Sequence, residues 1–111
     1  MVRLKQGDVV KVSFNPQVGH EQAGYRPAVV VSNRLLNDRI SLAFMCPVTH
    51  TDRNNPFHYE LTGYSFVDGF VLCDQLKSMD INSRDIKKIG SLRDSDICEI
   101  LDRIEMLIEK E

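Results

Sequence analysis

The chain has 111 residues, of which 42% are hydrophobic and 27% are charged. This length and mixed composition are typical of one globular domain and argue against disorder. No apolar run approaches the length of a membrane span, and residues 1–10 lack the apolar segment of a signal peptide. We therefore expect a single domain over residues 1–111, cytoplasmic and with no membrane partner.

The formal net charge of -2 is unevenly distributed along the chain. Residues 94–111 contain seven acidic and two basic residues, a balance of -5, so the preceding 93 residues carry +3. A polyanion can therefore bind the first part of the chain while the acidic end points elsewhere. The charge permits a nucleic-acid partner without establishing one.

The three cysteines, Cys46, Cys73 and Cys98, are odd in number and widely spaced. This usage favours reduced thiols in a cytoplasm, and the absence of a C-x-x-C pair gives no sign of a zinc site. We expect each cysteine to be a small buried apolar residue.

The first ninety residues predict a series of short strands. In the first of them, Val10, Val12 and Phe14 alternate onto one face. The predicted strands cover residues 8–14, 27–32, 41–49, 57–62, 69–80 and 85–90. Turn-forming sequences separate them at residues 15–24, 33–39, 50–56 and 63–69. Strands this short and closely spaced predict a small, strongly bent antiparallel sheet or barrel.

The end of the chain predicts an amphipathic helix. Six apolar residues recur at helical spacing on one face: Ile97, Ile100, Leu101, Ile104, Leu107 and Ile108. Ser91 or Ser95 is a candidate N-cap, and Asp94 and Asp96 suit the positive end of the helix dipole. The apolar face either packs on the sheet or joins a partner subunit, and periodicity does not decide between these.

Two places bring polar groups into the apolar pattern. The first is Glu21, Gln22 and Arg26, and the second is Thr49 with His50. The sequence contains no phosphate loop of the P-loop kind, no nucleophile elbow and no His–carboxylate pair at metal-ligand spacing. The histidines, His20, His50 and His58, lie in or beside turn-rich segments, so we expect them to be exposed.

An arginine and a threonine at strand ends suit work on a phosphodiester without a metal. The guanidinium is a permanent planar cation with five donors, and a threonine hydroxyl can orient a phosphate oxygen. RNA carries its own nucleophile, the 2′-hydroxyl, so the protein has only to align the attack, move a proton and stabilise negative charge. On spacing alone, an exposed loop arginine and a strand-ending threonine remain the alternative.

A longer pattern identifies a family. Residues 7–32, "GDVVKVSFNPQVGHEQAGYRPAVVVS", resemble the amino-terminal signature of the MazF/PemK toxins of bacterial toxin–antitoxin systems. The resemblance continues through "CPVT" (46–49), "VLCDQLKSMD" (71–80) and "EILDRIEMLIEK" (99–110). It covers nearly the whole chain in order, without large insertions.

The resemblance implies both a fold and an activity. The fold is a mainly β (α+β), SH3-like antiparallel barrel of the CcdB/MazF type with a carboxy-terminal helix. The activity is that of a ribosome-independent, metal-independent endoribonuclease that needs no cofactor. It cuts single-stranded mRNA at short sequences, leaves 2′,3′-cyclic phosphate and 5′-hydroxyl ends, and thereby inhibits translation and growth. The resemblance also implies a homodimer.

The resemblance assigns roles to particular residues. Arg26 stabilises the phosphorane, Thr49 orients the phosphate, and Glu21 helps in proton handling or loop order. Its implied RNA-contacting positions are Gln22, Asn37, His50, Gln75, Lys77 and Ser78. Tyr25 and Phe14 are candidates to stack on bases, although Phe14 equally fits a core position because it continues the Val10 and Val12 face.

The resemblance further implies a MazE-like antitoxin whose acidic, disordered segment covers the RNA site. Two alternatives stay open on the same fold: a gyrase-binding toxin resembling CcdB, and a non-catalytic binding subunit. Toxins like CcdB grip gyrase with a helix that ends in tryptophan, whereas this chain has no tryptophan and ends in "LIEKE". The loop at 50–59, "HTDRNNPFHY", departs from relatives, so the recognised RNA sequence does not transfer.

Overall fold

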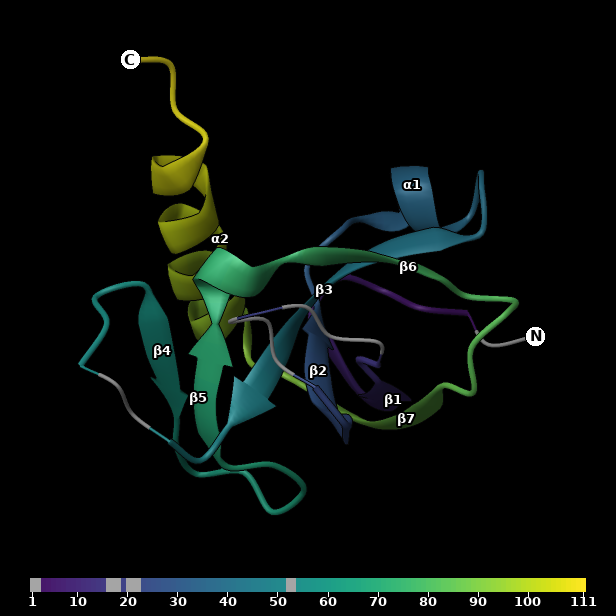
Figure 1. The fold of residues 1–111 in the computed structure, drawn as a ribbon, viewed down its shortest axis with the longest axis horizontal. Coiled ribbons are helices and arrows are strands. Elements are labelled where there is room, and N and C mark those ends of the chain that lie inside the picture. Colours follow the sequence, from purple (N-terminus) through teal and green to yellow (C-terminus); the bar gives the residue numbers. More distant parts are fainter. Residues whose placement is uncertain (1–2, 16–18, 20–22, 52–53) are drawn as a thin grey trace.

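The computed structural model describes residues 3–15, 19, 23–51 and 54–111 (Figure 1). The strands are β1 (Asp8–Ser13), β2 (Tyr25–Val30), β3 (Leu42–Thr49), β4 (His58–Leu61), β5 (Gly69–Leu72), β6 (Lys77–Asp80) and β7 (Lys87–Ser91). The helices are α1 (Arg34–Asn37), a single 3₁₀ turn η1 (Cys73–Gln75) and α2 (Asp94–Leu107). The mainly antiparallel β fold with a carboxy-terminal helix confirms the sequence prediction.

The strands form one strongly bent antiparallel sheet in the order β4-β5-β3-β2-β1-β7. On the edge away from β2, β3 has two successive partners: its first half pairs with β6 and its end, Val48 and Thr49, pairs with β5. Figure 1 shows β4 and β5 on one side of β3 and β2, β1 and β7 on the other. The sheet is barrel-like but open, since β4 and β7 do not pair within the described residues.

Two predicted segments have a different local structure. The strand expected at 69–80 is interrupted by η1, which lets the chain leave β5 and join β3 again as β6. The turn expected at 33–39 contains α1, whose N-cap Asn33 accepts a hydrogen bond from the backbone N–H of Leu35 at 3.0 Å. Both differences reflect pairing or capping that a run of residue types does not encode.

Both faces of the bent sheet bury apolar side chains. One cluster consists of Leu4, Val10, Val12, Phe14, Ala28, Val30, Ala43, Met45, Met79, Ile81 and Ile86. The second, on the opposite face, consists of Val9, Val29, Val31, Cys46, Val48, Leu61, Val67, Val71, Cys73, Leu92 and Ile100. Burial on both faces explains why the strands contain continuous valine runs rather than clean alternation.

Helix α2 packs on the second cluster through Ile97, Ile100, Leu101 and Ile104. Most of the apolar face of α2 therefore packs on the sheet, whereas Leu107 and Ile108 are 41% and 79% exposed. The expected serine cap is wrong. Arg93 is the N-cap and offers no side-chain cap, while Ser91 lies in β7 and donates to Asp8 Oδ1 at 3.0 Å.

Asp96 anchors the first turn of α2. It lies in the first turn, as predicted from the helix dipole, but its side chain is buried. Its carboxylate accepts hydrogen bonds from Tyr59 Oη at 2.5 Å, from Tyr64 Oη, and from Arg93 Nε at 3.2 Å. Desolvation opposes the charge on Asp96, but these hydrogen bonds outweigh it and lower the pKa of the carboxyl. The hydrogen bond to Asp96 and burial raise the pKa of Tyr59 to about 12. The carboxylate therefore ties α2 to β4 and to the segment before β5.

The cysteine prediction holds for two of three residues. Cys46 and Cys73 are buried free thiols, and burial raises the pKa of Cys73 to about 12. Cys98 is exposed on the outer face of α2, where helical periodicity places it away from the apolar stripe. Among the described residues, no helix is both long enough and apolar enough to cross a membrane.

Candidate active site

Arg26 is held at the start of β2 by the backbone of other segments. Its Nε donates to the carbonyl of Ala23 at 2.8 Å and its Nη1 donates to the carbonyl of Val48 at 3.3 Å. Both acceptors are neutral, and no carboxylate in the described part of the chain forms an ion pair with Arg26. The guanidinium is therefore oriented by dipoles while its positive charge stays available for an anion.

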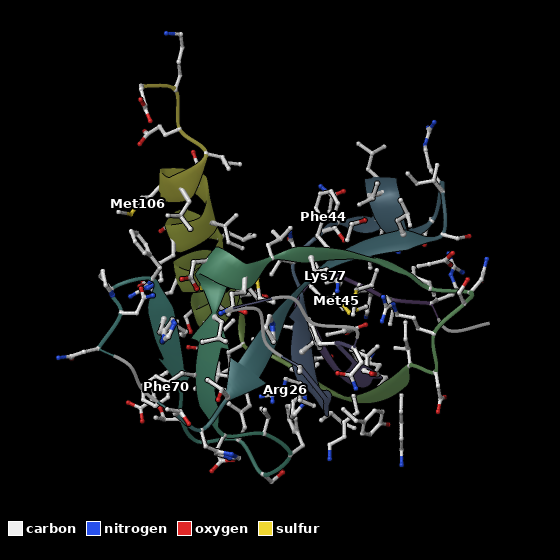
Figure 2. All side chains as sticks on the ribbon, in the orientation of Figure 1. Arg26, Phe44, Met45, Phe70, Lys77 and Met106 are labelled. Atoms are coloured by element: carbon white, nitrogen blue, oxygen red, sulfur yellow. The ribbon has the colours of Figure 1, made fainter. Side chains whose placement is uncertain are left out.

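Thr49 is the last residue of β3 and lies on the same face as Arg26. Ala28 pairs with Pro47 across β2 and β3, so residues two positions away, Arg26 and Thr49, point to that same side. The Val48 carbonyl that holds Arg26 belongs to the peptide bond before Thr49. The structure thus brings the two predicted catalytic residues together at one end of the sheet, where Figure 2 shows Arg26.

Gly69, the first residue of β5, packs against the backbone of Thr49. Its φ is 111°, and a Cβ at this position would lie 2.5 Å from the Thr49 carbonyl oxygen. Only glycine combines this backbone conformation with so close an approach. The backbone at the start of β5 therefore packs directly against the backbone of Thr49.

Lys77 and Ser78 face opposite sides of the sheet. Lys77 pairs with Met45, which shares the face of Pro47 and Thr49. Met45 is four residue steps before Thr49, a distance of about 13 Å along β3. Ser78 pairs with Phe44 and points to the other face. Lys77 is therefore on the side of Arg26 and Thr49, whereas Ser78 is not.

The other predicted RNA-contacting residues have different environments. Asn37 is buried, with its amide donating to the carbonyls of Leu4 and Ser32 at 3.2 and 3.0 Å and its Oδ1 accepting from Ser32 Oγ at 2.5 Å. These bonds give Asn37 a structural role here. Gln75 lies half-buried in η1. His50 is exposed as expected, with Nε2 2.9 Å from Asp68 Oδ1.

Glu21, Gln22 and His20 lie outside the described residues, but the two ends of their loop are described. Asn15 Oδ1 accepts a hydrogen bond from the backbone N–H of Gly24 at 3.0 Å. Arg84 Nη1, from the segment between β6 and β7, donates to the carbonyls of Ser13 and Asn15 at 2.8 and 3.3 Å. Arg84 was missed from the sequence, because nothing local marks a contact across 71 residues.

The two aromatic candidates separate clearly. Phe14 is 2% exposed within the first cluster, so of the two interpretations the core position is right. Tyr25 is 54% exposed at the start of β2, where the Lys11 ammonium lies 5.9 Å from its ring centroid. Tyr25 alone of the two has a ring that can stack on a base.

Phe70, Glu60 and His58, on the two strands beyond Thr49, were not predicted as site residues. Thr49 pairs with Phe70 of β5, and Phe70 pairs with Glu60 of β4, so the three side chains form one row on the same face. His58 lies two residues from Glu60 on that face. The expectation of an exposed His58 is wrong, because its side chain is 6% exposed and its Nε2 lies 3.7 Å from Asp74 Oδ1. Alternation in "FHYELT" was the available signal, since it sets His58 and Glu60 against Tyr59 and Leu61.

Comparison with known proteins places the chain in a family. Residues 5–108 match the family described as "PemK-like, MazF-like toxin of type II toxin-antitoxin system". The endoribonuclease toxin MazF of Escherichia coli K12 is 36% identical over 102 residues, which span 92% of this chain and 91% of the relative.

Solved structures agree with this assignment. A crystal structure of MazF from Deinococcus radiodurans has a TM-score of 0.91 and 32% identity, covering 99% of this chain and 100% of that chain. A MazE–MazF crystal structure from the same organism has a TM-score of 0.84 and 32% identity, with 100% of both chains covered. The chain therefore belongs to the PemK-like, MazF-like toxins of type II toxin–antitoxin systems.

Proposed function

We propose that this protein is a cytoplasmic, sequence-specific endoribonuclease that cuts single-stranded mRNA and acts as the toxin of a toxin–antitoxin pair. The observation that carries the proposal is Arg26, held by two neutral carbonyls beside Thr49 with its charge unpaired in the described part of the chain. A fixed cation next to a hydroxyl at a strand end suits a phosphodiester. The names of its relatives, endoribonucleases MazF and ChpB, support the same activity.

The proposed reaction uses the RNA's own 2′-hydroxyl. That oxygen gives up its proton and bonds to the adjacent phosphorus, while the bond from phosphorus to the 5′-oxygen breaks and the leaving oxygen takes a proton. The products are a 2′,3′-cyclic phosphate and a 5′-hydroxyl. Arg26 would stabilise the negative charge that accumulates on the phosphoryl oxygens, and Thr49 would fix their orientation. Glu21 is the proposed helper in proton transfer.

RNA binding is proposed to continue along the same face. Lys77 lies about 13 Å along β3 from Thr49, which suits a phosphate further along an extended strand. His50, Gln22 and Gln75 remain proposed RNA contacts. Asn37 is buried and Ser78 faces the opposite side of the sheet, so neither is placed to contact an RNA strand at Arg26 and Thr49.

We propose two protein partners. The first is a MazE-like antitoxin, by analogy with the MazE–MazF complexes of Deinococcus radiodurans. An acidic segment of such a partner would occupy the places of phosphates, and the +3 balance of residues 1–93 suits it.

The second partner is another copy of this chain. An apolar groove of about 360 Å³ lies between the end of α2 and the β3–η1–β6 region. Phe44, Leu76, Leu107 and Ile108 line it and are between 37% and 79% exposed. Ile108 lines the groove and is 79% exposed, so in a two-fold pair the Ile108 side chain of each copy could insert into the groove of the other. This self-complementary shape favours a homodimer.

The direct test is to incubate the purified protein, free of antitoxin, with a long single-stranded RNA in EDTA and to map the ends. We expect discrete cuts with 5′-hydroxyl termini. Arg26→Ala should lower the cleavage rate by at least about a thousandfold and Thr49→Ala by about a hundredfold, because each removes an interaction with the developing charge. Intact RNA from folded wild-type protein would refute the proposal, and gyrase poisoning by that preparation would favour the CcdB-like alternative.

A further inference from the structure

A small pocket opens on the face of β4 and β5 that carries Glu60 and Phe70, beyond Thr49. It has a volume of about 290 Å³, and we call it the β4–β5 pocket. Its walls are Asn54, Asn55, Pro56, His58, Glu60 and Phe70. None of the functional roles proposed above uses it.

The strand register places this pocket beside the proposed reaction centre. Thr49, Phe70 and Glu60 occupy neighbouring positions on three adjacent strands, so Glu60 is two strand spacings, about 10 Å, from Thr49. Figure 2 shows Phe70 and Arg26 toward the same end of the sheet, whereas Phe44 and Lys77 lie toward the other. One nucleotide can therefore hold its phosphate at Thr49 and reach the pocket with its base.

The pocket contains polar groups that the described protein does not satisfy. The Glu60 carboxylate is exposed and makes no hydrogen bond or ion pair within the described part of the chain. His58 has a 6% exposed side chain, and its Nδ1 has no hydrogen-bond partner in the described part of the chain. A buried unpaired polar atom costs free energy unless something binds it. The imidazole is meanwhile held from behind by Asp74, 3.7 Å from Nε2.

The combination of side chains selects a type of ligand. Phe70 offers an aromatic surface of the kind on which an unpaired base stacks. An ionised carboxylate only accepts hydrogen bonds, so Glu60 disfavours an edge that presents a lone pair toward it. Uracil, cytosine and adenine each place acceptors beside their donors on the Watson–Crick edge. Guanine places N1–H and the 2-amino group side by side, which matches both carboxylate oxygens.

We propose that the β4–β5 pocket binds one unpaired base next to the scissile phosphate and prefers guanine, with Phe70 stacking and Glu60 reading the Watson–Crick edge. This inference rests on the proposed ribonuclease function and adds residues that determine which RNA is cut. His58 lines the pocket beside Glu60, with its Nε2 3.7 Å from Asp74 Oδ1.

The experiment compares cut sites and matched substrates. Sequencing the ends produced from a long RNA by the wild-type protein should show guanine enriched at one position flanking the cut. A short RNA with that guanosine replaced by inosine, which lacks the 2-amino group, should be cut about tenfold more slowly. Glu60→Gln should cut the guanosine substrate about tenfold more slowly than wild type and should no longer distinguish guanosine from inosine.

Two further variants separate recognition from folding. Phe70→Leu keeps an apolar residue in β5 but removes the ring, so it should weaken cleavage of every RNA without changing the base preference. Glu105→Gln makes the same chemical change as Glu60→Gln on the exposed side of α2 and should leave both preference and rate unchanged. Circular dichroism and melting temperatures establish that each variant is folded.

Failure of the inference is distinguishable from failure of the proposed function. If the wild-type protein cuts RNA but shows no guanine preference, or if Glu60→Gln retains the discrimination against inosine, the pocket assignment is wrong. If the wild-type protein cuts no RNA, the proposed activity is wrong. Fluorescence anisotropy with a short single-stranded RNA that contains one guanosine, and with its inosine counterpart, then decides the pocket. Tighter binding of guanosine RNA that Glu60→Gln abolishes would support it, and equal binding would overturn it.

Discussion

At the scale of single residues, the candidate active site is built by the backbone. Two carbonyls orient Arg26, and the end of β3 presents Thr49. The 2.5 Å separation between an added Gly69 Cβ and the Thr49 carbonyl shows how closely the next strand supports this point. A change at Gly69 therefore acts on the chemistry without touching a reacting group.

We expect Gly69→Ala to lower the RNA cleavage rate by about tenfold or more, because a Cβ must push the Thr49 backbone away and the φ of 111° disfavours alanine. Gly63→Ala is the matched control. Gly63 also has a positive φ, of 82°, but an added Cβ there would meet only the flexible side chain of Arg93. Both variants should lose thermal stability, and only Gly69→Ala should lose activity. Equal cleavage by the two would contradict this role.

Residue chemistry could be predicted where it depends on neighbours in the chain. Arg26 and Thr49 interrupt apolar runs, and this local signal placed both at strand ends. Asn37 and His58 could not be assigned from sequence. The bonds of Asn37 reach Leu4, 33 residues away, and the environment of His58 is set by Asp74. Their burial is a property of strand pairing, which residue types do not fix.

At the scale of elements, α2 is attached by both apolar packing and one carboxylate. The helix itself was predictable from its 3.6-residue period, as was its acidic first turn. Its start was not, since Asp96 replaces a serine cap by binding Tyr59, Tyr64 and Arg93. The break at η1 in the predicted 69–80 strand could not be predicted from the sequence either. It arises because β5 and β6 pair in succession with the same edge of β3.

The Asp96 cluster gives a pH dependence with a definite sign. The lowered pKa of Asp96 means that its stabilisation is present above its unfolded pKa, about 3.9, and is lost as the pH falls through the folded value. The raised pKa of Tyr59 means that its contribution is present below about 10 and is lost as the pH rises through about 12. Urea unfolding across pH should therefore show losses at both ends.

Asp96→Asn tests this assignment. At pH 7 the variant should be less stable by about 3 kcal/mol, because charged hydrogen bonds are lost and partners are left buried. The difference from wild type should shrink below pH 4, where wild-type Asp96 takes up a proton. Asp94→Asn, exposed in the same first turn, serves as control and should change the free energy of unfolding by less than about 1 kcal/mol. A difference that is constant with pH would exclude the carboxylate as the cause.

At the scale of the whole molecule, the apolar groove at the end of α2 is not covered by any other part of the described chain. We expect Ile108→Glu to convert the proposed homodimer to a folded monomer at micromolar concentration, because a charge would have to be buried in the groove. Met106→Glu is the control, since Met106 is 62% exposed on the side of α2 away from Phe44 (Figure 2). Sedimentation equilibrium distinguishes the two. A monomeric wild type would refute the proposed dimer.

The exchange of partners along β3 has a consequence for local stability. Leu42–Met45 all pair with β6, and Met45 also pairs with Val30 of β2, whereas Val48 and Thr49 depend on the short strand β5, which is itself supported by β4 near the edge. Amide protons near Thr49 should accordingly exchange with solvent through partial openings that detach β4 and β5, while those of Leu42–Met45 should exchange only on global unfolding. The end of the molecule that presents Thr49 would thus belong to a separate, weaker cooperative unit, free to adjust to a bound strand while the rest of the sheet stays folded.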